Sequence, residues 1–171
     1  MVSIRKATLH DAESVIEVLS RYYNFENKDE ALQIFHREYS LHYHFRVAVE
    51  GDEILGVVSW RMHGLPKHGI AKLKRIAVLP DSEQRSMVLE MLYDAALADM
   101  DYFYRDQGYA LRKVYMMVPG NNQFLHAFVR DHGMHCEARL HSHYYEGRDE
   151  YMYSLFMIQH SPMLSGVPSV A

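Results

Sequence analysis

The segment best suited to chemistry is a strand that runs directly into a helix. The pattern over residues 70–79 predicts a strand that Pro80 stops, and a helical pattern begins at Ser82. The first N–H groups of a helix have no acceptor within it, and together with the helix dipole they attract anions. Arg85 lies at this helix start and adds a cation. The alternative is an ordinary strand-to-helix connection with solvated charges.

A second candidate is a group of metal-ligating residue types near the C-terminal end of the chain. His132, His135, Cys136, His141 and His143 fall within twelve residues. Regular strand alternation would place His141 and His143 on one face, where they could chelate zinc or nickel. The group lacks the spacing of standard zinc sites. We therefore expect surface histidines, Cys136 as a small buried hydrophobe, and no bound metal.

These residues must be positioned by the regular elements that the hydrophobic periodicity predicts. The expected strands are 2–7, 45–50, 54–62, 70–79, 111–118, 134–143 and 150–158. The expected helices follow Thr8, start at Asn27 and Ser82, and run from Asn121 or Asn122 to about His132. The order β-α-α-β-β-β-α-β-α-β-β is typical of an α+β (mixed α/β) domain around one central sheet. We expect one domain at residues 1–158 and a flexible tail at 159–171.

Composition narrows the class of protein. The chain has 171 residues, of which 49% are hydrophobic and 23% charged, as in an ordinary globular domain. A net charge of -4 gives no electrostatic case for nucleic acid. A single cysteine excludes an intramolecular disulfide, so a reducing interior is the default. With no signal peptide or spanning apolar run, we expect a cytoplasmic protein that does not use a membrane.

Motifs in this order resemble the GNAT superfamily of acyltransferases. Val78-Leu79-Pro80 resembles the family's Val-x-Pro strand end. With one extra residue allowed, residues 84–89 align with its Gln/Arg-x-x-Gly-x-Gly/Ala loop, although Met87 and Leu89 fill the two glycine positions. The opening segment 3–19, the strand 55–58, the helix 122–134 and the hairpin 144–152 also resemble the family. The likeness covers residues 2 to about 158.

The resemblance implies a fold and a donor substrate. It implies a mostly antiparallel twisted sheet of about seven strands, flanked by about four helices. It also implies that acetyl-CoA binds where strands 70–79 and 111–118 splay apart, and that the protein needs no metal. The donor-binding residues carried over are Ile76, Ala77, Val78, Gln84, Arg85, Ser86, Met87, Val88, Leu89 and Asn122.

The same resemblance implies that an amine acceptor attacks the thioester directly, which requires a base and an acid. No carboxylate lies in strand 70–79, so His63 and His68 are the candidate bases, with solvent-facing loop histidines as the alternative. Val129 occupies the position where the family often has a tyrosine that serves as the general acid. Water or Tyr145 would then protonate the leaving group. Asn122 has a second interpretation, as a plain helix N-cap.

The acceptor pocket is implied by an aromatic break between the first two helices. Tyr22, Tyr23 and Phe25 would line a pocket for an organic amine or a peptide N-terminus, or else plug the helical corner. We expect an N-acetyltransferase acting on a primary amine of a small molecule or peptide. The alternatives are an acyl-CoA-binding or regulatory protein without turnover, and a protein with no CoA site that forms a homodimer through its late strands.

Overall fold

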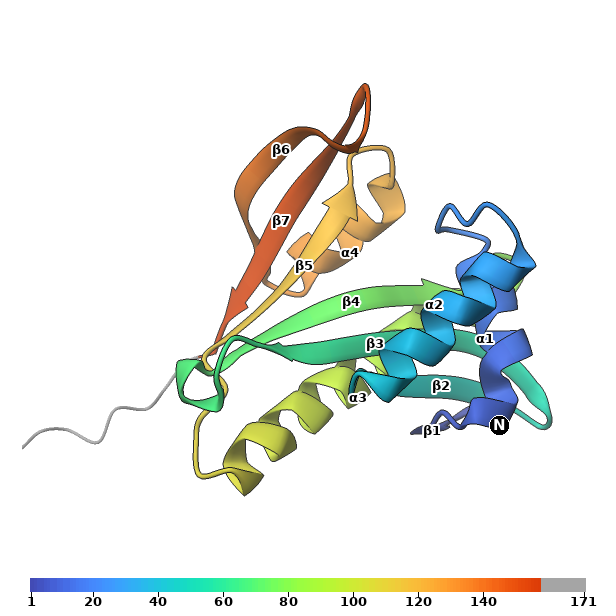
Figure 1. The fold of residues 1–171 in the computed structure, drawn as a ribbon, viewed down its shortest axis with the longest axis horizontal. Helices are drawn as coiled ribbons and strands as arrows, with labels where there is room; N and C mark the ends of the chain where they lie inside the picture. Colours follow the sequence, from blue (N-terminus) through green and yellow to red (C-terminus); the bar gives the residue numbers. More distant parts are fainter. Residues whose placement is uncertain (158–171) are drawn as a thin grey trace, which may run out of the picture.

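The structure, a computed structural model, describes residues 1–157 of the chain and is shown in Figure 1. The expected boundary at residue 158 and the expected tail at 159–171 lie outside the described residues. Helices α1 (Ala12–Leu19) and α2 (Lys28–Ser40) follow β1 (Ser3–Lys6), and the meander β2 (His44–Glu50), β3 (Glu53–His63) and β4 (Ile70–Val78) comes next. The remaining elements are α3 (Arg85–Asp106), β5 (Lys113–Pro119), α4 (Gln123–Asp131), β6 (His135–Tyr145) and β7 (Arg148–Phe156).

One seven-stranded sheet holds all the strands in the order β1-β2-β3-β4-β5-β7-β6. Every neighbouring pair is antiparallel except β4 and β5, which run parallel. This confirms the predicted α+β class, the order of elements and the mostly antiparallel sheet. In the described part of the chain, no helix is long and apolar enough to cross a membrane.

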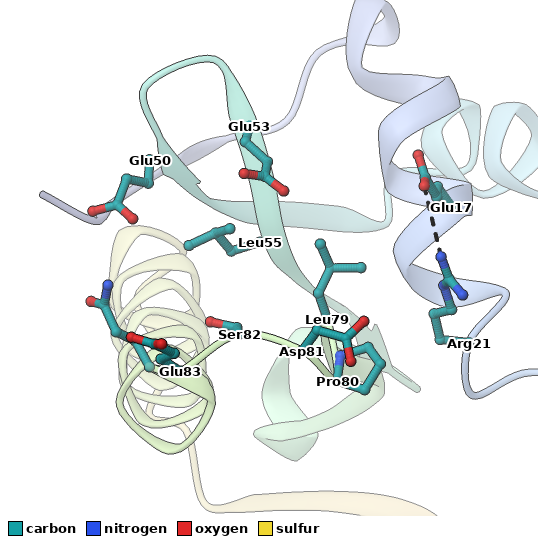
Figure 2. A pocket seen from close by; sticks show the side chains of 11 residues that line it. Glu17, Arg21, Glu50, Glu53, Leu55, Leu79, Pro80, Asp81, Ser82 and Glu83 are labelled. Atoms are coloured by element: carbon teal, nitrogen blue, oxygen red, sulfur yellow. Dashed lines mark ion pairs between the residues drawn. The ribbon is translucent and has the colours of Figure 1, made fainter.

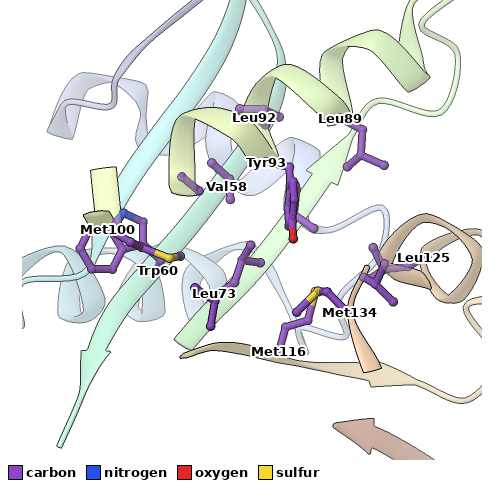
Figure 3. Close-up of a cluster of buried hydrophobic side chains, with 14 of the residues drawn as sticks. Val58, Trp60, Leu73, Leu89, Leu92, Tyr93, Met100, Met116, Leu125 and Met134 are labelled. Atoms are coloured by element: carbon purple, nitrogen blue, oxygen red, sulfur yellow. The ribbon is translucent and has the colours of Figure 1, made fainter. Parts of the chain in front are cut away.

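The sheet is covered on both faces by helices with apolar stripes. Helices α1 and α2 pack on one face over Phe45, Val47 and Val57. On the other face α3 buries Leu92 and other apolar side chains against strands β3 and β4, as Figure 3 shows. Such burial is the main source of stability in a domain of this size.

The sheet opens between β4 and β5. These strands pair only from Ile70↔Lys113 to Lys72↔Tyr115. Pairing shifts from Ser59↔Arg75 to Trp60↔Leu73, so Lys74 is an extra residue on β4. A β-bulge of this kind bends its strand and disturbs the ladder. Beyond it β4 and β5 diverge, and Figure 1 shows β5, β6, β7 and α4 leaning away from the rest of the sheet.

Helix ends follow the sequence signals at two positions and depart from them at a third. The Asn27 side chain accepts the N–H of Glu30 at 2.9 Å, and that of Asn122 accepts the N–H of Leu125 at 3.0 Å. The third helix starts at Arg85 and not at Ser82, because Ser82 lies in a turn in which its N–H donates to Leu79.

Candidate functional site

The free edge of β4 beyond the bulge presents backbone groups to the opening. Leu79 N–H donates to Leu55 O on β3 at 2.8 Å, so by strand alternation the N–H and C=O groups of Ile76 and Val78 point the other way. Two tyrosines from the segment after α1 reach them. The Ile76 N–H donates to the Tyr23 hydroxyl at 3.3 Å, and the Tyr22 hydroxyl donates to Val78 O at 2.7 Å.

Both tyrosine hydroxyls stay protonated at neutral pH. Burial raises the pKa of Tyr22, although the nearby Arg85 opposes the shift. Burial also raises the pKa of Tyr23, against the lowering effect of its hydrogen bond with Ile76 and of the charge on Arg75. Each hydroxyl can therefore act as a donor as well as an acceptor toward the β4 edge.

Beside this edge lies a narrow space that we call the Arg85 crevice. Its volume is about 20 Å³, and its walls are Tyr22, Ile76, Ala77, Val78, Arg85, Leu89, Asn122, Phe124 and Leu125. The Arg85 guanidinium carbon lies 4.1 Å from the centre of the Phe124 ring and 5.7 Å from that of Tyr22. Cations over aromatic faces are held electrostatically. The protein's own side chains therefore nearly fill the opening here.

The start of α3 determines which of residues 84–89 lie within the helix. Only Gln84 precedes the helix, and its side chain does not cap it. Val88 and Leu89 point into the core, with 0% and 3% exposure, whereas Met87 is 43% exposed. Among the described residues, the N–H groups of Ser86 and Met87 have no acceptor. The helix start can thus hold an anion through backbone groups, but residues 88 and 89 contribute no surface polar atoms.

The outer side of the same connection is acidic. A pocket of about 450 Å³ lies between α1, the β2–β3 turn and the β4–α3 connection, as Figure 2 shows. Five carboxylates line it, Glu17, Glu50, Glu53, Asp81 and Glu83, with one cation, Arg21. Excess negative charge repels phosphates. An anion at the start of α3 would therefore have to approach from the Arg85 crevice.

A wider space, the tyrosine cavity, adjoins the crevice through Tyr22. It has a volume of about 360 Å³ and is lined by Tyr22, Tyr23, Asn24, Phe25, Ile34, Lys72, Lys74, Arg75, Met117, Pro119, Tyr144, Tyr145, Arg148 and Glu150. The segment after α1, β4 and the β6–β7 hairpin supply most of its wall; Figure 1 shows where these elements lie. The structure thus brings together the three predicted acceptor residues with Tyr145.

Two ion pairs support the walls of this cavity. Arg75 pairs with Glu38 of α2, which is only 4% exposed. Arg148 pairs with Glu150 at 3.0 Å, and Glu150 is 2% exposed. Glu150 is the one carboxylate that lines the cavity among the described residues. No sequence motif marks Glu150, since only the pairing of β7 with β5 places its side chain here.

The other predicted residues fall outside the tyrosine cavity. His63 ends β3 at the closed end of the opening, where its Nδ1 lies 2.8 Å from the Tyr115 hydroxyl. The cavity lining does not include His63. Asn122 lines the Arg85 crevice and also caps α4, so both of its expected roles are geometrically compatible. Val129 is fully buried in the core.

The late histidines do not keep the expected arrangement. Pairing between β6 and β7 is irregular from Leu140 to Tyr145, and Ser142 has a φ of +46°. The alternation invoked for His141 and His143 is therefore broken. Cys136 is exposed, not buried, because it lies on the edge strand β6. Within residues 1–157, no three histidine, cysteine or acidic side chains form a group that could hold a metal ion.

Comparison with known proteins gives a consistent answer at the level of fold. No protein-family model and no curated protein sequence matches the chain. Solved structures do match. The ribosomal-protein-S18-alanine N-acetyltransferase from Escherichia coli aligns with a TM-score of 0.76 at 14% identity, over 96% of this chain and 99% of that one.

Two further matches have similar coverage. A GNAT-family acetyltransferase from Bacillus cereus aligns with a TM-score of 0.69 at 15% identity, over 93% of this chain and 99% of that one. The spermidine/spermine N-acetyltransferase from Vibrio cholerae, in mutant forms, aligns with a TM-score of 0.68 at 15% identity, over 91% and 95%. Together with the sheet order and the opening between β4 and β5, these matches show that the chain has the fold of the GNAT-family acetyltransferases.

Proposed function

We propose that this chain is an N-acetyltransferase that moves an acetyl group from acetyl-CoA to a primary amine by direct attack. The observation that carries the proposal is the free edge of β4, where the backbone groups of Ile76 and Val78 face the opening beside the tyrosine cavity. A donor bound along this edge and an acceptor in the cavity would meet at Ile76. The three solved acetyltransferases with this fold support the reaction class.

The residues present fit the donor in their hydrogen-bonding chemistry. The amides of the pantetheine arm can pair with the Ile76 carbonyl and the Val78 backbone groups as a neighbouring strand would, once the two tyrosine hydroxyls give way. The free N–H groups at the start of α3 suit the pyrophosphate, and Arg85 can turn from its aromatic partners to add a charge. Asn122 lies on the opposite wall of the crevice and can contact the arm.

The chain's own groups would then serve the transfer as follows. The neutral amine nitrogen attacks the thioester carbon, the C–S bond breaks, and the electron pair leaves on sulfur. The Ile76 N–H can donate to the oxyanion, as backbone amides do in acyl transfer. Glu150 is the carboxylate of the cavity and can take the amine proton, directly or through water. Tyr145, also in the lining, can return a proton to the thiolate.

His63 remains the second candidate for the base, acting through a relay. Its imidazole contacts the Tyr115 hydroxyl, and that ring lies 5.6 Å from the Lys72 ammonium of the cavity. Replacing each candidate separately discriminates between them. Glu150→Gln should lower kcat at least a hundredfold if Glu150 is the base, whereas His63→Gln should then leave kcat within about twofold of the parent value. The reverse pattern would assign the base to His63.

The second candidate function is an acyl-CoA-binding protein without turnover. The nearly filled Arg85 crevice and the replacement of both loop glycines by Met87 and Leu89 favour it. Thermal unfolding with acetyl-CoA tests both functions, because a ligand that binds only the folded state must raise the melting temperature. No shift at millimolar acetyl-CoA would contradict both. Release of CoA with a panel of primary amines then supports the enzyme, and a shift without release supports the binding protein.

A further inference from the structure

The tyrosine cavity contains a charge arrangement that the proposed reaction does not use. Its two arginines are neutralised within the protein, Arg75 by Glu38 and Arg148 by Glu150. Lys72 and Lys74 also line the cavity, and neither has a carboxylate within 4.0 Å among the described residues. The cavity therefore carries two positive charges that the described protein does not balance.

Lys72, Lys74 and Arg75 reach the same face through strand alternation and the β-bulge together. Regular alternation would already place both on one side, and the extra residue at Lys74 adds the adjacent Arg75 to that side. On the neighbouring strand β3, Arg61 lies opposite Lys72 in the strand register. Arg61 also has no carboxylate partner in the described structure. Three cations of β4, Lys72, Lys74 and Arg75, thus line the cavity, and Glu38 compensates only Arg75.

Both lysines are half-buried, and burial disfavours the charged form of their ammonium groups. Burial lowers the pKa of Lys72, and the charges on Arg61 and Arg75 lower it further. Burial also lowers the pKa of Lys74, with Arg75 and Lys72 as the next causes. An uncompensated cation in a partly desolvated site is destabilising unless an anion joins it. Groups in a cleft whose pKa values are shifted by burial and by neighbouring charges are candidates for a functional site.

We propose that the acceptor is a primary amine that also carries a carboxylate, which Lys72 and Lys74 hold while the amine faces Ile76. This inference rests on the proposed acetyl transfer and names its substrate class. Along a regular strand, the Cα atoms of Lys74 and Lys72 lie roughly 7 and 13 Å from the Cα atom of Ile76, at about 3.3 Å per residue. The separation suits an amine and a carboxylate joined by a short chain, in a free amino acid or in an acidic peptide N-terminus. A polyamine would place a second cation against the lysines.

The first test compares amines that differ only in the carboxylate. 5-Aminopentanoate and 5-amino-1-pentanol have amines of similar basicity and the same chain length. Measured by CoA release, kcat/KM should be at least tenfold higher for 5-aminopentanoate than for the alcohol, mainly through a lower KM. Added salt should reduce this preference for the acid. Spermidine should be the poorest substrate. Equal kcat/KM for the acid and the alcohol, or a preference for spermidine, would overturn the proposal.

The same assay separates the two sources of the carboxylate. The peptides Asp-Glu-Ala and Asn-Gln-Ala, with amidated C-termini, report on an acidic peptide, and 5-aminopentanoate and glutamate report on free amino acids. Discrimination confined to the peptides would identify a peptide acceptor. Discrimination confined to the amino acids would identify a small-molecule acceptor. Either result supports the proposal. If the enzyme discriminates in neither set, the proposal is contradicted.

The matched variants are the double substitution Lys72→Met with Lys74→Met and the control Lys67→Met, an exposed lysine outside the cavity. The double variant should lose the preference for the acid over the alcohol while it still acetylates the alcohol. Lys72→Arg with Lys74→Arg should restore most of the preference. A preference that persists in the methionine variant would overturn the proposal, and circular dichroism confirms that this variant is folded.

A binding measurement keeps this inference distinct from the proposed reaction. With CoA present, 5-acetamidopentanoate should raise the melting temperature of the parent and of Lys67→Met, and leave the double methionine variant unchanged. If no amine releases CoA, acetyl transfer fails, but this shift still decides whether the lysines bind a carboxylate. Absence of the shift in the parent protein would overturn the carboxylate site. CoA release without discrimination would overturn only this inference.

Discussion

The Arg85 crevice and the tyrosine cavity share Tyr22 and open along the same strand, yet they differ in the free volume that they offer to a ligand. The crevice is about 20 Å³ because Arg85 packs on Phe124 and the two tyrosine hydroxyls cover the β4 edge. The cavity is about 360 Å³ and needs no rearrangement to admit a small ligand. The proposed acceptor site is therefore preformed, whereas the proposed donor site must move its own side chains to bind.

The two sites also differ in how their charges are satisfied. In the crevice, a single cation rests on aromatic faces, from which it can be withdrawn at low cost. In the cavity, buried ion pairs fix the wall, and the lysines next to them are left unbalanced. This contrast indicates that stability is concentrated on the acceptor side and adaptability on the donor side.

The largest expected effect comes from breaking the buried ion pair behind the cavity. Glu38→Ala leaves the largely buried Arg75 guanidinium without its carboxylate partner, and such a change costs about 3–5 kcal/mol of unfolding free energy. Urea unfolding of the variant measures it. The double variant Glu38→Met with Arg75→Met should recover most of the loss, since neither charge is then buried. A loss below about 1 kcal/mol would contradict the view that this pair supports the wall.

The next effect is on the donor side and leaves stability nearly unchanged. Arg85→Ala should weaken acetyl-CoA binding by about tenfold or more, because a charge-assisted contact to phosphate contributes about 1.5–3 kcal/mol. Isothermal titration measures this. Arg105→Ala, an exposed arginine near the other end of α3, is the matched control. Equal affinities for the two variants would mean that Arg85 only packs on Phe124.

The fold was predictable because its signals are local. Strand alternation, the turn at Gly51 and the glycine after α4 mark where elements begin and end, and Gly133 indeed has a φ of +77°. The start of α3 was predicted too early, at Ser82, because the helical pattern of the sequence does not separate a preceding turn from the first turn of the helix. In the structure the turn at Ser82 precedes the helix, and Gln84 occupies the N-cap position without a side-chain bond.

The site was predictable only where one segment builds it. Tyr22, Tyr23 and Phe25 come from one short segment and line one cavity together. Glu150 reaches that cavity through the pairing of β7 with β5, and Arg75 reaches it through the bulge in β4. Sheet register and bulges depend on contacts distant in sequence, so no local pattern reveals them.

A smaller effect tests whether the tyrosines compete with the donor for the β4 edge. Tyr23→Phe removes the hydroxyl bound to the Ile76 N–H and should lower the unfolding free energy by about 0.5–1.5 kcal/mol. The same change should tighten acetyl-CoA binding severalfold, because the N–H no longer exchanges one partner for another. Urea unfolding and isothermal titration measure the two quantities. Weaker binding would instead place the hydroxyl in contact with the ligand.

The smallest expected effect is on the pH dependence of the unfolding free energy. It involves one histidine from each of the two parts of the sheet that flank the opening. His44 of β2 stacks on Trp60 of β3, and His126 forms hydrogen bonds with Tyr153 and Pro119 on the far side of the opening. Burial is the main cause that lowers the pKa of each imidazole in the folded state.

A lowered folded-state pKa means that the unfolded chain binds these protons more readily. The stabilisation is fully present above the unfolded histidine pKa of about 6.5 and is lost as pH falls below it. Unfolding free energies measured by urea between pH 7.5 and 5 should therefore decrease, and His44→Gln and His126→Gln should each flatten the decrease. A variant that leaves the decrease unchanged would mean that the imidazole it replaces has no lowered pKa in the folded state.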